Sequence, residues 1–146
     1  MVDVSGKEVS DRMAKAEATV LMKPETLRII RQKEISKGDV LEVARLAGIM
    51  ATKRTDELIP LCHSLGLDSA CIEFSFPDEA SLHIKSTVRV AGKTGVEMEA
   101  LTAVTVAGLT VYDMCKSVDR GMEITNVRLV EKSGGNSGHF VRANNN

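Results

Sequence analysis

The longest helical pattern in the chain lies between Lys93 and Val118. This segment has no proline, and beyond Gly95 near its start it has a single interior glycine, Gly108. Its apolar residues recur at intervals of three and four, which gives an α-helix one broad apolar face. They are Ala100, Leu101, Val104, Ala107, Val111, Cys115 and Val118. Thr94 followed three positions later by Glu97 has the form of a capping box, so we expect the helix to begin near Thr94.

Apolar and polar residues alternate in two segments, 69–76 and 82–90, as in a β-strand with one buried face. The apolar positions are Ile72, Phe74 and Phe76 in the first segment and Leu82, Ile84, Val88 and Val90 in the second. Residues 77–81 would join the two strands as a hairpin with one solvent-facing side. Residues 16–22 and 122–132 are predicted as the first and last strands.

Helical signals follow the first strand. Pro24 suits the first turn of a helix over residues 24–33. Asp39 with Glu42 three positions later resembles a capping box that opens a second helix, and Pro60 ends it. The order strand, helices, strand, strand, helix, strand predicts an α+β fold, a ferredoxin-like βαββαβ sandwich. Its antiparallel sheet would carry helices on one face, with an extra helix after the first strand.

Length and composition indicate how many domains the chain has and where it is expected to be located. A chain of 146 residues suggests a single domain over residues 1–146. We expect residues 1–14 to form a polar arm and the glycine-rich residues 133–146 to form a flexible tail. The three cysteines form no CxxC motif, and no segment resembles a secretion signal or a membrane span. The expected location is therefore the cytoplasm, with no membrane partner.

Net charge and aromatic content argue against nucleic acid as a partner. The formal net charge is −1, and aromatic residues make up 3% of the chain. RNA-recognition modules share the ferredoxin-like topology, but they need stacking aromatic residues and a basic face. Phe74 and Phe76 instead lie on the face that we predict to be buried. RNA binding is therefore the weaker alternative to an enzyme.

The charged residues of the long helix are candidates for chemistry. Glu99 and Asp113 are fourteen positions apart, close to four whole turns, so they share roughly one face. They are also separated by about 21 Å along the helix axis. A small molecule beside the helix could not easily touch both. Either a second copy of the chain completes each site, or the two acids bind opposite ends of a long ligand.

Structural explanations compete with functional ones at each of these positions. Glu97 is explained by capping, and Glu99 near the amino end and Lys116 in the last turn are favoured by the helix dipole. Asp113 opposes the dipole, which should raise its pKa unless Lys116 compensates. Lys37 precedes a helix start, where it would strengthen an anion site or serve as a solvated loop lysine.

Two tempting motifs do not hold. Gly92 to Thr94 reads GKT between a strand and a helix, but a P-loop needs a glycine where Thr87 stands. Cys62 and His63 are adjacent, a poor spacing for two ligands of one metal or for a Cys–His nucleophile pair. We therefore expect no metal site, and a loop at Cys62 and His63 that contacts a ligand.

Several stretches together resemble the family of molybdenum cofactor biosynthesis protein C (MoaC), the cyclic pyranopterin monophosphate synthases. They are MVDVSGK at 1–7, KGDV at 37–40, AGI and KRTDELIPLCHSL between 47 and 65, GKTGVEMEALTAV at 92–104, YDMCKSV at 112–118 and KSGGNSG at 132–138. The resemblance covers nearly the whole chain. LCH, GKTGVEMEALTA and YDMCK in this order are highly specific.

The resemblance implies an activity and an assembly. The family converts a cyclised dihydro form of GTP into cyclic pyranopterin monophosphate with release of diphosphate, so the chain would be a lyase of molybdenum cofactor biosynthesis. Its members form homohexamers, each a trimer of dimers, with sites at the dimer interface. The upstream pathway neighbour would be a radical SAM GTP cyclase. No cofactor is required, although Mg²⁺ could accompany the triphosphate. A non-catalytic ligand sensor is a further alternative.

The resemblance also implies roles for particular residues. The catalytic residues would be Asp113, Lys116 and Lys37, from the YDMCK and KGDV stretches. The substrate-binding residues would be Leu61, Cys62, His63, Met98 and Glu99, with Glu97, Lys53, Arg12 and Lys132 also at the pocket. The cations among them would contact phosphate oxygens. Two positions depart from the family: Ser64 replaces the usual proline after LCH, and Asn136 replaces a frequent lysine.

Overall fold

The computed structural model describes residues 1–143. Within these residues the elements are β1 (Ser10–Leu21), α1 (Pro24–Arg31), α2 (Val40–Thr52), α3 (Thr55–Leu58), β2 (Ser69–Asp78), β3 (Ser81–Gly92), α4 (Glu97–Cys115), β4 (Glu123–Ser133) and β5 (Phe140–Val141). The strands form one antiparallel sheet in the order β2-β3-β1-β4-β5. The predicted α+β, ferredoxin-like arrangement is confirmed.

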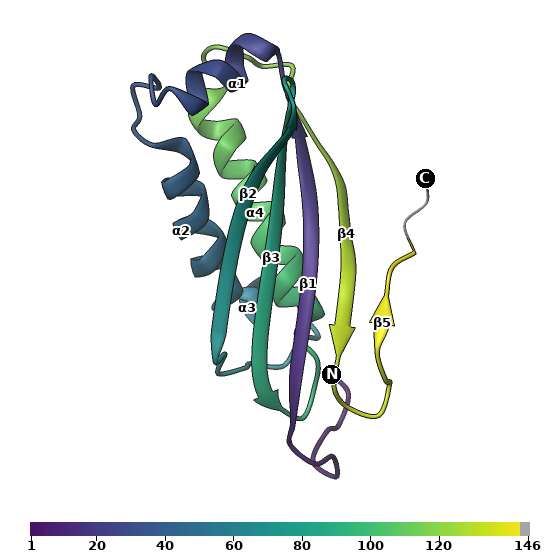
Figure 1. The fold of residues 1–146 in the computed structure, drawn as a ribbon. Coiled ribbons are helices and arrows are strands. Elements are labelled where there is room, and N and C mark those ends of the chain that lie inside the picture. Colours follow the sequence, from purple (N-terminus) through teal and green to yellow (C-terminus); the bar gives the residue numbers. More distant parts are fainter. Residues whose placement is uncertain (144–146) are drawn as a thin grey trace.

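The helices cover one face of the sheet, as Figure 1 shows. Helix α4 contacts β1, β3 and β4, and α2 packs beside α4 and against β2. The inward residues of β1 are small, and all four are fully buried: Ala14, Ala16, Ala18 and Val20. Close packing of α2 on α4 depends on Gly48, where a Cβ atom would lie 2.8 Å from the Ala103 carbonyl oxygen.

The first strand begins earlier than the sequence predicts. β1 starts at Ser10 and pairs with β3 along its whole length, from Ser10 opposite Gly92 to Leu21 opposite Ser81. The predicted polar arm over residues 1–14 is therefore too long. Alanine at the inward positions gives little hydrophobic signal, so the alternation at residues 10–15 resembles a polar segment.

The long helix begins later and ends sooner than predicted. α4 starts at Glu97, its N-cap residue is Val96, and no side chain caps it. The capping box predicted at Thr94 is therefore wrong. The Glu97 carboxylate pairs instead with the Lys132 ammonium, at 2.9 Å. Lys116 is the C-cap residue, so the last predicted turn, to Val118, is absent.

The predicted starts of helices α1 and α2 are confirmed. Pro24 occupies the first turn of α1. The Asp39 side chain accepts a hydrogen bond from the Glu42 backbone N–H at 3.3 Å and so caps α2. Helix α2 ends at Thr52 rather than near Pro60, and the short helix α3 follows.

The predicted tail over 133–146 is partly ordered into strands. Ser133 is the last residue of β4, and β5 pairs with β4 by placing Phe140 opposite Lys132. Residues 144–146 of that predicted tail lie outside the described residues. The fold thus sets one long helix along the sheet, with the α1–α2 loop at one end of that helix and α3 at the other (Figure 1).

Candidate active site

An acid and two lysines meet at the carboxyl end of α4. The Lys37 ammonium donates to the Asp113 carboxylate at 3.1 Å and to the Asp113 backbone carbonyl at 3.0 Å. Lys116, one turn along, donates to the other carboxylate oxygen at 2.7 Å. We call these three residues the Asp113 cluster. All three side chains are at least half exposed, so the cluster is open to a ligand from solvent.

The two lysines decide the charge of Asp113. Hydrogen bonds from Lys116 and then from Lys37 hold the pKa of the Asp113 carboxyl below its usual value. The dipole of α4 alone would raise this pKa, so the lysines outweigh it. At neutral pH, Asp113 is therefore a carboxylate able to accept a proton. The ammonium groups beside it can donate protons or bind an anion.

A cavity of about 420 Å³ lies at the amino end of α4. We call it the amino-end cavity. It is lined by Val2, Val4, Lys7, Leu61, Cys62, His63, Leu65, Thr94, Gly95, Glu97, Met98 and Glu99. The loop after α3, the start of α4 and the first residues of the chain supply this lining. The predicted substrate-binding stretches LCH and EME are thus gathered around one space.

Glu99 is the buried acid of the amino-end cavity, with 4% of its surface exposed. Burial raises its pKa, and the nearby negative charges of Glu97 and Asp56 add to this effect. Burial also raises the pKa of the Cys62 thiol. Glu99 and Asp113 therefore differ in surroundings although they lie on one helix. The first tends to hold its proton, and the second tends to release it.

We expect Glu99→Gln to stabilise the fold at neutral pH. The raised pKa means that the folded state binds the Glu99 proton more tightly than the unfolded chain does. The free energy of unfolding therefore falls as pH rises from the unfolded pKa, about 4.3, through the folded pKa. Glutamine has no carboxyl group to ionise, so it avoids the cost of burying one and should raise the free energy of unfolding by about 1–3 kcal/mol at pH 7.

The gain from Glu99→Gln should shrink on acidification, because below the unfolded pKa of about 4.3 the glutamic acid is mostly neutral in both states. Denaturant titrations of the wild-type chain and the variant at pH 7 and pH 4 measure the difference. An equal difference at both pH values would contradict a buried, ionising Glu99.

The LCH loop is tied to its neighbours by polar contacts. The His63 Nε2 atom lies 2.8 Å from the Val2 carbonyl oxygen, so Nε2 carries the proton in this contact. Ser64, which replaces the family's proline, hydrogen-bonds to the Asp56 carboxylate. A side-chain contact thus restrains the backbone that proline would otherwise stiffen.

Three predicted cations, Lys132, Arg12 and Lys53, do not line the amino-end cavity themselves. Lys132 pairs with Glu97 and donates to the Ser137 hydroxyl at 2.7 Å. Arg12 donates to the backbone carbonyls of Gly92 and Lys93, at 2.9 and 3.2 Å. Lys53, at the end of α2, lines an adjacent cavity of about 480 Å³. Leu65 borders both cavities.

The predicted site residues therefore form two groups at opposite ends of α4. The fourteen positions from Glu99 to Asp113 correspond to about 21 Å along the axis. One chain does not bring the Asp113 cluster to the amino-end cavity.

Sequence reasoning missed part of the cavity wall. Val2, Val4 and Lys7 lie against it, and the Lys93 ammonium holds this segment through the Ser5 carbonyl oxygen at 3.1 Å. The MVDVSGK stretch was a signal of similarity, but nothing in it indicated contact with the loop after α3. Among residues 1–143, no group of three or more His, Cys, Asp or Glu side chains could hold a metal ion, and no helix could cross a membrane.

Comparisons with known proteins point to one family. A family model described as the MoaC family matches residues 1–135. A relative from Syntrophomonas wolfei, named cyclic pyranopterin monophosphate synthase, is 59% identical over 143 residues, which cover 97% of this chain and 91% of the relative. A relative of the same name from Brevibacillus brevis is 58% identical over 142 residues, covering 97% and 89%.

A third relative, from Mycobacterium tuberculosis, is named cyclic pyranopterin monophosphate synthase 3. It is 58% identical over 142 residues, which cover 97% of this chain and 80% of the relative. The similarity therefore extends over both ends of α4, including the Asp113 cluster and the amino-end cavity. By the extent of the family match and the identity of these relatives, the chain belongs to the MoaC family.

Proposed function

We propose that this chain is a cyclic pyranopterin monophosphate synthase acting in molybdenum cofactor biosynthesis. Its substrate would be the cyclised dihydro form of GTP, and its second product would be diphosphate. The observation that carries the proposal is that Lys37, 76 positions away in the sequence, joins Lys116 at the Asp113 carboxylate. Curated relatives with more than half of their residues identical carry this enzyme name, which supports the same assignment.

The geometry of the Asp113 cluster suits the chemistry of phosphate ring closure. An attacking hydroxyl group must lose a proton as it bonds to phosphorus, and the bond from phosphorus to the departing diphosphate must break. Asp113 is ionised and would accept that proton, although the lysines that lower its pKa also make it a weaker base. The Lys37 and Lys116 ammonium groups would stabilise the negative charge that develops on the leaving oxygen. This step is the lyase reaction.

The amino-end cavity would hold the purine-derived ring. Its wall combines apolar contacts, such as Leu61 and Met98, with the polar groups of His63 and Glu99. Arg12, Lys53 and Lys132 would bind phosphate oxygens at its rim. Because the Asp113 cluster lies at the far end of α4, we infer that a second chain supplies it, in a homohexamer built as a trimer of dimers.

The direct test is turnover. The purified chain, incubated with the cyclised dihydro-GTP, should release diphosphate and form cyclic pyranopterin monophosphate, which mass spectrometry identifies. Chelating Mg²⁺ with EDTA before the assay tests whether the triphosphate needs the metal. Nucleotide binding without diphosphate release would favour the ligand-sensor alternative. Tight, salt-sensitive RNA binding in a filter assay would favour the RNA-binding alternative.

The remaining predictions about cellular context stay predictions. A radical SAM GTP cyclase would supply the substrate, and the cytoplasm would be the location. Fractionation of cells that produce the untagged chain, followed by immunoblotting, tests the location.

A further inference from the structure

The loop between α1 and α2 contains a lysine in an unusual backbone conformation. Helix α1 ends in a Schellman arrangement, in which the Lys33 N–H bonds to the Ile30 carbonyl and the Glu34 N–H to the Ile29 carbonyl, both at 3.1 Å. Lys33 occupies its left-handed position, with φ of 58°. Glycine is the common residue there because it has no Cβ to clash. A lysine at this position is strained, and a structural role for its side chain can offset that strain.

The Lys33 side chain supplies such a role. Its ammonium lies 2.8 Å from the Asp39 carboxylate, and Asp39 is the residue that caps α2. One ion pair therefore joins the two ends of the loop over residues 33–39. Lys37 lies inside the segment that this pair closes.

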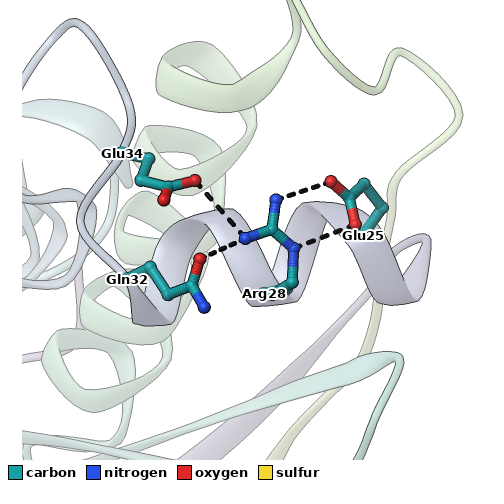
Figure 2. Close-up of polar contacts among 4 residues, drawn as sticks. All are labelled: Glu25, Arg28, Gln32 and Glu34. Atoms are coloured by element: carbon teal, nitrogen blue, oxygen red, sulfur yellow. Dashed lines mark hydrogen bonds and ion pairs between the residues drawn. The ribbon is translucent and has the colours of Figure 1, made fainter.

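The rest of the loop is restrained on both sides of Lys33. Figure 2 shows the Arg28 guanidinium bonded to both Glu25 carboxylate oxygens, to the Gln32 side chain and, at 3.5 Å, to Glu34. Ile35 is buried in the core. After Ile35, the loop residues Ser36, Lys37 and Gly38 are exposed.

Lys37 depends on where the loop places its backbone. Its ammonium makes two contacts, both with Asp113, and its long side chain is half exposed. A flexible, exposed lysine side chain keeps such contacts only when its Cα atom is held at the right distance. A shift of the loop would weaken both contacts together.

We propose that Lys33 is a positioning residue, whose ion pair with Asp39 closes the α1–α2 loop and holds Lys37 against Asp113. Only the expected effect of Lys33 on turnover rests on the proposed function. Lys33 touches none of the Asp113 cluster itself, so it acts through Lys37.

The test uses Lys33→Gly, because glycine removes the ion pair and also fits the left-handed backbone. The thermal midpoint should stay the same or rise, whereas kcat should fall about two- to fivefold, as expected for loss of one exposed ion pair. KM should change by less than about twofold. Lys33→Arg, which keeps the charge, should retain most of the kcat.

A double-mutant cycle separates positioning from general destabilisation. In a Lys37→Ala background, Lys33→Gly should cause no further loss of kcat, because the residue that it positions is absent. An equal loss in both backgrounds would overturn the proposal. So would a Lys33→Gly variant with unchanged kcat.

A second readout needs no turnover. Carbon-detected NMR of the Asp113 carboxyl should show its pKa rising in Lys33→Gly, because the Lys37 hydrogen bond that lowers this pKa is weakened. An unchanged Asp113 pKa would overturn the proposal. If the wild-type chain releases no diphosphate, the proposed function fails, and this titration still decides the role of Lys33.

Discussion

Replacing Asp113 with asparagine is expected to lower turnover at least about a hundredfold and to leave the fold intact, the lower end of the effect seen for proton-transfer residues. Asparagine keeps the shape of the side chain but cannot accept the proton. Asp113 lies on the surface of α4, and its partners Lys37 and Lys116 are half exposed. Losing the ion pairs of Asp113 with these lysines therefore disturbs no core packing. Steady-state diphosphate release measures turnover, and thermal unfolding measures the fold.

The matched control is Glu131→Gln. Glu131 is also a carboxylate with two basic partners, Lys15 at 2.7 Å and the His139 ring at 3.0 Å, but it lies on β4, away from the Asp113 cluster. Its substitution should leave kcat within about twofold of the wild-type value, as for an ordinary surface change. Lys116→Ala should lose activity as Asp113→Asn does. Near-normal conversion by Asp113→Asn would remove the aspartate from the mechanism.

Mixed assemblies should recover activity that neither parent variant has. Asp113→Asn damages the cluster at one end of α4, and His63→Ala damages the amino-end cavity at the other. If each site takes its cluster from one chain and its cavity from a two-fold partner, a mixed dimer has one intact site and one doubly damaged site. Random pairing of equal amounts should then restore about a quarter of wild-type turnover.

The control for this experiment mixes two variants of the same group, Asp113→Asn and Lys116→Ala. Such mixed dimers contain no intact cluster, so their activity should stay at the level of the parents. Native mass spectrometry of differently tagged chains verifies that mixed assemblies form. Verified mixed assemblies without recovery would show that both groups act within one chain. A monomer with full activity would likewise show that both groups act within one chain.

The sequence predicted those parts of the fold whose signals lie within one strand or one helix end. Alternating residues such as Ile84, Val88 and Val90 marked β3 directly, and the Asp39 cap marked the start of α2. The start of β1 was missed because Ala14, the fully buried residue of the missed part, is small and follows a polar stretch. The sheet completes this strand because its partner β3 offers backbone hydrogen bonds along the full length.

The misplaced start of α4 shows where local signals fail. Thr94 and Glu97 have the spacing of a capping box, but a local hydrogen bond competes with any partner that the fold brings near. Here the partner is Lys132, which is 35 positions away along the chain and reaches Glu97 from β4. A charge-assisted contact between two partly buried groups replaces the local cap.

The sequence by itself determined the long helix, the alternating strands and the Asp113–Lys116 pair, because each depends on residues within one or two turns or on one strand. Only the tertiary structure decided that Lys37 joins this pair and that Glu99 is buried while Asp113 is exposed. Helical spacing fixes the direction of a side chain on its own helix. What lies in that direction depends on which loops and strands pack there, and those come from distant parts of the chain.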